Sequence, residues 1–331
     1  MALTLEFLSD GAIPALTALA SAPVETALTV GGAAADLYRP RDKGPHPGLV
    51  MVHGLVEEGR RDARLIRAGR RLARSGFAVL VPDLPELRRG RLRPEDARHV
   101  VDAVKVLRRA PGAASRVALV GISVGAGPVL FAAADPEIRD EVDLVMTLGG
   151  YAEAKALVQH MLTGGADREL VRAFVLRNVD LFAPPTDQGL LVEALTRSFE
   201  ALEDAGLQRR LTPAGRVVAK LLTRRTPGDV AEALETLPEE GQTLLRTLSP
   251  IRVAETLRAR LLLIHGRGDP AVPFTESQKL FAAARPHIQA RLTLLRVVGH
   301  VDPSASDLKN ALAFAADVLD LWGVAYVLLS L

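Results

Sequence analysis

The segment Gly121-Ile122-Ser123-Val124-Gly125 is a Gly-x-Ser-x-Gly motif that lies between an apolar run and a helical segment. A sharp turn from strand to helix would hold Ser123 in a strained backbone conformation, and the two glycines would leave room for the neighbouring strand and helix. The hydroxyl would then stand at a helix start, where peptide dipoles favour a developing negative charge. The motif therefore predicts that Ser123 is a nucleophile, with a plain helix cap after a glycine-rich turn as the alternative.

A serine nucleophile needs a general base, and His300 is the candidate among the seven histidines. It follows the last predicted strand, at the sheet edge where active-site groups gather. Asp269 follows another predicted strand, in a tight turn between two glycines and a proline. A carboxylate there would hold the His300 imidazole in one tautomer and stabilise its charged form. The order Ser123, Asp269, His300 predicts a catalytic triad, against the alternatives of a solvated loop histidine and a turn aspartate.

The elements that must position these residues are indicated by short, continuous apolar runs. Such runs are typical of strands buried on both faces of a parallel sheet, and they cover residues 48–52, 77–81, 116–120, 142–148, 260–265 and 291–298. Two more strands are expected earlier, an alternating edge strand at 24–30 and a second strand at 35–38. Helical patterns lie between the runs, at 62–75, 94–109 and 275–284, with a last helix from Ser304. The alternation predicts an α/β fold with a mostly parallel central sheet flanked by helices.

Strand signals stop after Gly150 and resume at Arg260. Helical patterns fill the interval, at residues 152–162, 168–181, 187–202, 211–222 and 230–248. Since the sheet needs both flanks, we interpret this block as an inserted helical lid. The expected organisation is an N-terminal helical extension at 1–22, a core of 23–150 and 249–331, and a lid at 151–248. The apolar C-terminal stretch 322–331 packs either on the sheet or on a partner subunit in a homodimer.

Composition excludes several classes of protein. The 331 residues include 41 Lys+Arg and 39 Asp+Glu, which leaves a net charge of +2, and 4% aromatic residues, so nucleic acid is not an expected partner. The sequence has no cysteine, which removes disulfides and thiolate metal sites. No apolar stretch reaches the roughly 20 residues of a membrane span, and the start lacks a basic signal-peptide region. We therefore expect a cytoplasmic protein.

Taken together, these motifs resemble the α/β-hydrolase superfamily, in its dienelactone-hydrolase-like and carboxylesterase-like branch of serine hydrolases. The resemblance covers residues 24–150 and 250–322, and rests on Val50-Met51-Val52-His53-Gly54, Val81-Pro82-Asp83, the Gly-x-Ser-x-Gly motif, His265-Gly266-Arg267-Gly268-Asp269 and Gly299-His300. It implies an α/β-hydrolase fold and an oxyanion hole formed by the backbone N–H groups of Leu55 and Val124.

From the triad we expect hydrolysis of a small-molecule carboxylic ester through an acyl-enzyme, with no cofactor and no metal. Two alternatives stay open: acyl transfer to another acceptor on the same triad, and a non-catalytic protein that binds a small apolar ligand. His53 and Tyr151 are candidate pocket residues, although His53 more simply braces its loop. Glu153 is a reserve candidate for the triad acid.

Some of the same residues also fit the motifs of a second class of enzyme, the short-chain dehydrogenases. Gly121, Gly125 and Gly127 also fit the glycine pattern of short-chain dehydrogenases, and Tyr151 with Lys155 fits their Tyr-x-x-x-Lys motif. In those enzymes the glycine loop follows the first strand and lies far before the tyrosine. Here several predicted strands precede the glycines, and no acidic residue is placed to hold a ribose. The spacing therefore argues against a nicotinamide cofactor.

Overall fold

The central feature of the protein is one eight-stranded sheet, seen in a computed structural model that describes residue 6 and residues 15–42, 44–110, 113–165, 167–296 and 311–330. The strands are β1 (Val24–Val30), β2 (Ala33–Arg39), β3 (His46–Val52), β4 (Ala78–Pro82), β5 (Ala113–Ile122), β6 (Val142–Leu148), β7 (Arg260–Gly266) and β8 (Ala290–Leu295). Their order is β1-β2-β4-β3-β5-β6-β7-β8. β2 is antiparallel to β1 and β4, and all other neighbours are parallel. The prediction of a mostly parallel sheet with an edge strand at 24–30 is confirmed.

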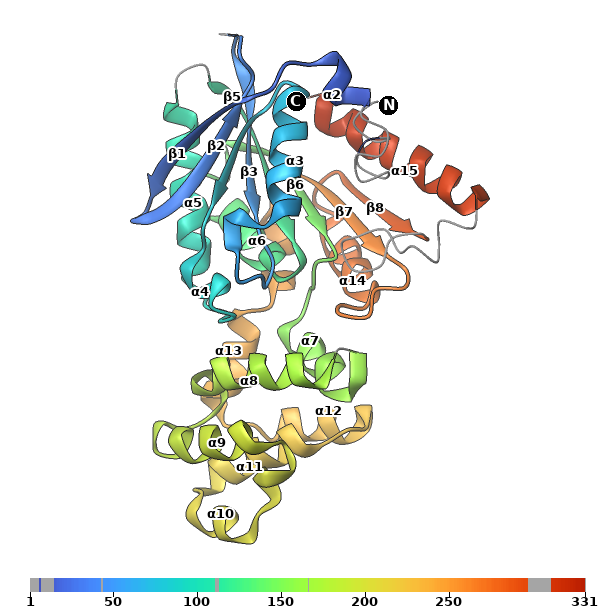
Figure 1. Ribbon diagram of the computed structural model, residues 1–331. Helices are drawn as coiled ribbons and strands as arrows, with labels where there is room; N and C mark the ends of the chain where they lie inside the picture. The colour runs from blue at the N-terminus through green and yellow to red at the C-terminus, as the bar shows by residue number, and fades with distance from the viewer. Residues whose placement is uncertain are drawn as a thin grey trace.

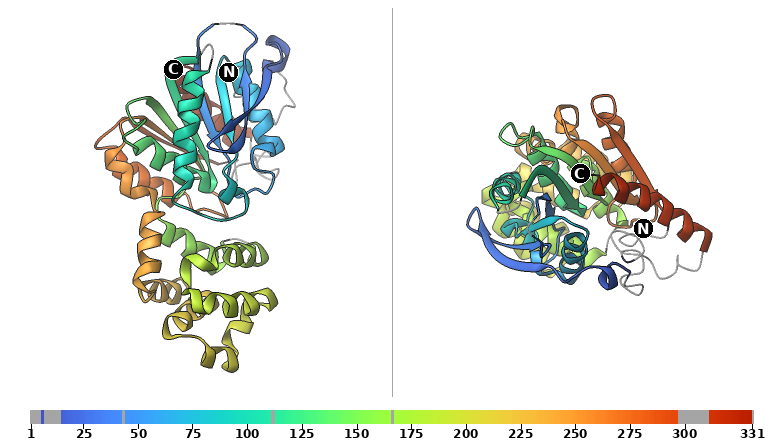
Figure 2. Two further views of the ribbon diagram at one scale, coloured as in Figure 1. Left: turned by 90° about the vertical axis from the view of Figure 1, so that its left-hand side faces the viewer. Right: turned by 90° about the horizontal axis from the view of Figure 1, so that it is seen from above.

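Helices cover both faces of this sheet (Figures 1 and 2). Those around the core are α2 (Ala15–Leu19), α3 (Ala63–Arg74), α4 (Pro85–Arg88), α5 (Asp96–Arg109), α6 (Ala126–Ala134), α14 (Thr275–Ala284) and α15 (Ala311–Leu329). Successive strand residues point to opposite faces, so Leu49 and Met51 pack in a cluster with α3 and α15, while Val50 and Val52 pack with α5, α6 and α14. The two clusters together form the core, and they fix the strand ends that carry the site.

A block of helices separates β6 from β7, and the described part of this interval contains no strand. Its helices are α7 (Ala154–His160), α8 (Arg168–Phe182), α9 (Pro185–Arg197), α10 (Ala205–Arg210), α11 (Pro213–Thr223), α12 (Pro227–Glu235) and α13 (Glu239–Thr247). Figure 1 shows the block beyond the sheet edge at which β6 ends. The single helix expected at 230–248 is wrong, because Pro238 lacks the N–H that would continue it; α12 ends before Pro238 and α13 begins after it.

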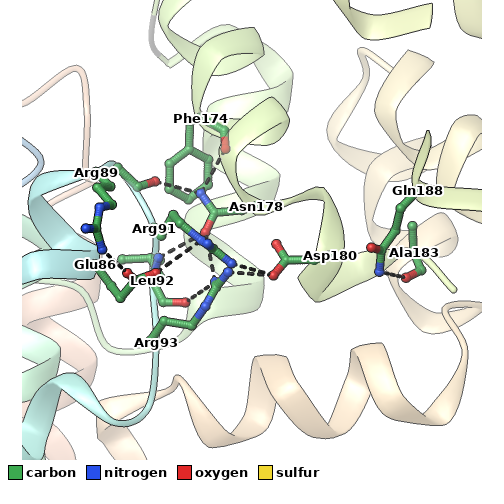
Figure 3. A network of polar contacts seen from close by, with 11 residues as sticks. Glu86, Arg89, Arg91, Leu92, Arg93, Phe174, Asn178, Asp180, Ala183 and Gln188 are labelled. Carbon is green, nitrogen blue, oxygen red and sulfur yellow. Dashed lines mark hydrogen bonds and ion pairs between the residues drawn. The ribbon is translucent and has the colours of Figure 1, made fainter. Parts of the chain in front are cut away.

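Helix α8 ties this insertion to the core beside α4 (Figure 3). Asn178, which is fully buried, accepts the backbone N–H of Leu92 at 2.9 Å. Asp180 accepts from the guanidinium groups of Arg91 and Arg93 at 2.7 and 2.6 Å. Because a buried amide loses several contacts if the surfaces part, this seam holds the insertion against the core.

One face of helix α15 packs against the sheet. Leu321, Val324 and Leu328 join the apolar cluster that contains Leu262 and Ile264 of β7. This is the first of the two placements expected for the C-terminal stretch. In the part of the chain that the structure describes, no helix is long and apolar enough to cross a bilayer.

Candidate active site

Ser123 lies at the turn between β5 and α6, as the motif predicts. β5 ends at Ile122, and a single 3-10 turn, Ser123–Gly125, leads into the helix. Ser123 has φ 54°, and among the described residues it is the only one other than glycine with a positive φ. A Cβ at Gly121 would lie 2.6 Å from the Cα of Ala126, so only glycine fits below the turn. The strained serine and the missing side chains therefore belong to one tight backbone turn.

The loop after β3 passes directly beside Ser123. A Cβ at Gly54 would lie 3.2 Å from the Ser123 Cβ and 3.8 Å from its Oγ. A Cβ at Gly125 would overlap the carbonyl oxygen of His53. Leu55 follows this contact and is 36% exposed, whereas Val124 is buried. The two residues whose N–H groups are the candidate oxyanion donors thus belong to segments that adjoin Ser123.

His53 braces this loop from within. Its ring has no exposed surface; Nδ1 lies 2.8 Å from the Gly54 carbonyl oxygen, and Nε2 accepts the N–H of Leu84 at 3.2 Å. Burial lowers the pKa of the imidazole, against the opposing effects of the Gly54 carbonyl and the charge of Asp83. A carbonyl accepts only, so the neutral ring carries its proton on Nδ1. Both ring nitrogens are engaged by the backbone, as a bracing residue requires.

Tyr151 lies at the base of the insertion rather than on an open surface. It is 2% exposed, and its hydroxyl donates to the carbonyl oxygen of Leu248 at 2.9 Å. A Cβ at Gly127 would lie 2.5 Å from the Tyr151 hydroxyl oxygen, so α6 packs closely against it. Burial raises the pKa of this hydroxyl well above its usual range. Tyr151 therefore links the segment just after β6 to the end of α13.

Asp269 follows β7 at the same sheet edge. The register pairs Ile122 with Leu148 and Leu148 with Ile264. Ile122, directly before Ser123, and Ile264, near the end of β7, therefore lie in one row across the sheet. Neighbouring strands lie about 4.8 Å apart, which separates β5 from β7 by roughly 10 Å. Asp269 is 8% exposed, and its Oδ1 accepts the N–H groups of Ala271 and Val272 at 2.8 and 2.9 Å. The carboxylate is thus held by its own loop.

Sequence reasoning gave no role to the side chains that pack behind Asp269. His265 is buried at the end of β7, with Nε2 at 3.3 Å from Asp269 Oδ2 and at 2.9 Å from the Val272 carbonyl oxygen. Its Nδ1 lies 2.7 Å from the Ser277 hydroxyl oxygen, on α14. The only signal in the sequence is a histidine four positions before the aspartate. The reserve acid Glu153 instead forms a half-exposed ion pair with Lys279 at 2.6 Å.

The candidate base His300 lies outside the described residues. β8, the strand before it, pairs in parallel with β7 up to Gly266 and Leu295, so the chain leaves β8 at the same edge as Asp269. No group of three or more histidine, aspartate or glutamate side chains that could hold a metal occurs within the described ranges.

A sequence model of the alpha/beta hydrolase family matches residues 49–315. Since this match covers most of the chain, the protein belongs to the alpha/beta hydrolase family, which confirms the superfamily that the motifs resemble. Membership supports a hydrolase. No curated protein matches the sequence at a significant level.

Several solved structures are similar in fold. Acylaminoacyl peptidase from Pyrococcus horikoshii matches with a TM-score of 0.50 and 15% identity, over 86% of this chain and 39% of that one. The chain thus spans about two fifths of the peptidase. Dienelactone hydrolase from Anabaena variabilis has a TM-score of 0.48 and 18% identity, over 90% and 96% of the two chains. An esterase from Pyrococcus furiosus has a TM-score of 0.48 and 12% identity, over 90% and 89%. At these identities the peptidase match supports the fold alone.

Proposed function

We propose that the protein is a serine esterase that cleaves small carboxylic esters through a Ser123, His300 and Asp269 triad. The observation that carries this proposal is the positive φ of Ser123 at the strand-to-helix turn, next to the Gly54 loop. A non-glycine residue in that conformation costs about 1–3 kcal/mol, and such strain clusters at active sites. Family membership and the position of Asp269 at the same edge add support.

In this mechanism the Ser123 hydroxyl oxygen attacks the ester carbonyl carbon while His300 takes the hydroxyl proton. The N–H groups of Leu55 and Val124 bind the resulting oxyanion. As the tetrahedral intermediate collapses, the bond to the alcohol oxygen breaks, and His300 returns the proton to that oxygen. Water, activated by His300, then attacks the acyl-enzyme and releases the acid and free Ser123. Asp269 orients His300 throughout.

We also propose that the helical insertion is a lid that receives the apolar part of the ester. A hollow within it is partly open to solvent, and its lining is entirely apolar: Val158, Met161, Leu162, Val171, Phe174, Val175, Phe182, Leu221 and Leu222. His160, beside Met161, contacts the acid loop through its Nε2 and the Pro270 carbonyl oxygen at 2.9 Å. Helix α7, whose Val158 lines the hollow, is thus followed at its end by a contact to the residue after Asp269. Cytoplasmic location and a homodimer stay predictions of the sequence.

Hydrolysis of p-nitrophenyl esters by Ser123→Ala tests the proposal. We expect a loss of at least about 1,000-fold in kcat, whereas Ser75→Ala, at the end of α3, keeps full activity. A fluorophosphonate probe reacts only with an activated serine, so an unlabelled protein would instead support non-catalytic binding. Product analysis with added alcohols separates hydrolysis from acyl transfer. Full ester turnover by Ser123→Ala refutes the assignment.

A further inference from the structure

The buried ring of His265 bridges the loop of Asp269 to α14. Its side chain and that of Asp269 have no exposed surface. On one side, Nε2 faces the Val272 carbonyl oxygen at 2.9 Å and Asp269 Oδ2 at 3.3 Å. On the other side, Nδ1 faces the hydroxyl oxygen of Ser277, which is also fully buried, at 2.7 Å. The mechanism above uses neither His265 nor Ser277.

The partners of this ring determine where its proton lies. A carbonyl oxygen only accepts, so Nε2 carries the proton that faces Val272 and Asp269. The Ser277 hydroxyl can then donate to Nδ1, which fixes the tautomer. Asp269 Oδ1 is already held by two backbone N–H groups. Backbone N–H groups of its own loop thus hold Oδ1, and the His265 ring lies against Oδ2.

We propose that His265 is a positioning residue for the triad acid: with its tautomer set by Ser277, it holds the Asp269 carboxylate in the orientation that the base requires. This inference rests on the esterase function proposed above. A displacement of about 1 Å at a group that orients a reacting side chain can cost about 100-fold in rate. The same ring also ties Val272 to the carboxylate, so the loop and the acid move together.

A purely structural role for His265 makes a different prediction. Loss of a core side chain would reduce the amount of folded protein, but each folded molecule would keep the same chemistry. Loss of a positioning residue would change the chemistry of folded molecules. In particular, a carboxylate that turns away stabilises the charged base less, so the pKa of the base falls and the acid limb of kcat/KM moves to lower pH.

The experiment compares His265→Leu, His265→Gln and Ser277→Ala with the control His287→Leu, since His287 is exposed on the loop before β8. Fluorophosphonate titration counts reactive serines, and p-nitrophenyl ester turnover from pH 5 to 8 is expressed per reactive site. We expect His265→Leu to lose about 10- to 100-fold in kcat/KM and to shift its acid limb downward. His265→Gln, which keeps an N–H donor, recovers part of the loss. His287→Leu matches the wild type.

The outcomes separate the inference from the function on which it rests. If the wild type is labelled and His265→Leu matches it in both kcat/KM per site and acid limb, His265 is structural and the inference is wrong. If His265→Leu fails to fold, Ser277→Ala decides, because it keeps the ring and removes only the hydroxyl; an unchanged rate and pH profile overturns the inference. If the wild type is not labelled, the esterase proposal fails and takes the inference with it.

Discussion

The turn at Ser123 and the loop of Asp269 leave the same edge of one sheet, yet they are held by different means. At Ser123, close backbone contacts at Gly121, Gly125 and Gly54 fix the chain and impose a positive φ. At Asp269, hydrogen bonds to the carboxylate fix the loop, and a Cβ at Gly268 would meet nothing within 4 Å. The first strand end depends on side chains being absent, and the second depends on particular side chains being present.

The largest effect that this contrast predicts is that of Asp269→Asn. The amide has nearly the same shape, so the loop should survive, but it cannot stabilise the charged base of the proposed triad. We expect kcat for p-nitrophenyl esters to fall by about 1,000- to 10,000-fold. Steady-state kinetics measure this directly. Glu153→Gln is the matched control, since it makes the same chemical change at the reserve acid and should alter kcat less than about twofold. If Glu153→Gln lost activity and Asp269→Asn kept it, Glu153 would be the triad acid.

The second prediction adds one methyl group at Gly125, beside Ser123, and one at Gly268, beside Asp269. In Gly125→Ala the new Cβ meets the His53 carbonyl oxygen, which must shift and carry the Gly54 loop away from Ser123. We expect about 100-fold lower kcat/KM and about 1–3 kcal/mol lower unfolding free energy. Gly268→Ala has open space and should stay within about 0.5 kcal/mol of the wild type. Urea unfolding and ester kinetics test both variants, and equal effects would abolish the contrast.

The third prediction isolates the strain at Ser123. Neither Ser123→Ala nor Ser123→Gly can act as nucleophile, but glycine adopts φ 54° freely and alanine does not. After the higher entropy of an unfolded glycine is subtracted, Ser123→Gly should be about 0.5–1 kcal/mol more stable than Ser123→Ala. At Ser75, where φ is −85°, the order should reverse. Urea midpoints that rank glycine below alanine at both serines would show that the turn is not strained.

The parallel core follows closely from local sequence. The expected strands 24–30 and 142–148 and the helix 275–284 match the observed Val24–Val30, Val142–Leu148 and Thr275–Ala284. Continuous burial makes each of these segments recognisable without its neighbours. In the insertion, apolar positions alone merged α12 with α13 and missed α10, whose start is set by Asp204 as a helix cap. Breaks of a few residues are set by single prolines and caps, which a pattern of apolar residues does not resolve.

The candidate site likewise has one part that the sequence predicts and one part that it does not. The glycines around Ser123 are local requirements of one turn, so a five-residue motif was sufficient to predict it. The support behind Asp269 joins residues 12 positions apart, His265 and Ser277, through a contact that exists only after β7 and α14 pack. Likewise, the buried Glu276 accepts the N–H groups of Ala152 and Glu153 across the fold. Such pairs leave no periodicity or motif, so only the tertiary structure reveals them.

The last prediction concerns the acid sensitivity of the Ser123 side. Burial lowers the pKa of His53 from 6.5, so the folded state keeps the ring neutral while the unfolded chain binds a proton below about pH 6.5. Stability is therefore fully present above that pH and declines as the pH falls towards the lowered value, by at most about 1.4 kcal/mol per pH unit. In His53→Gln, the amide oxygen can still accept the Leu84 N–H, and this decline should disappear. Urea unfolding of both proteins at pH 8, 6.5 and 5 measures it, and parallel declines would assign the acid sensitivity to other groups.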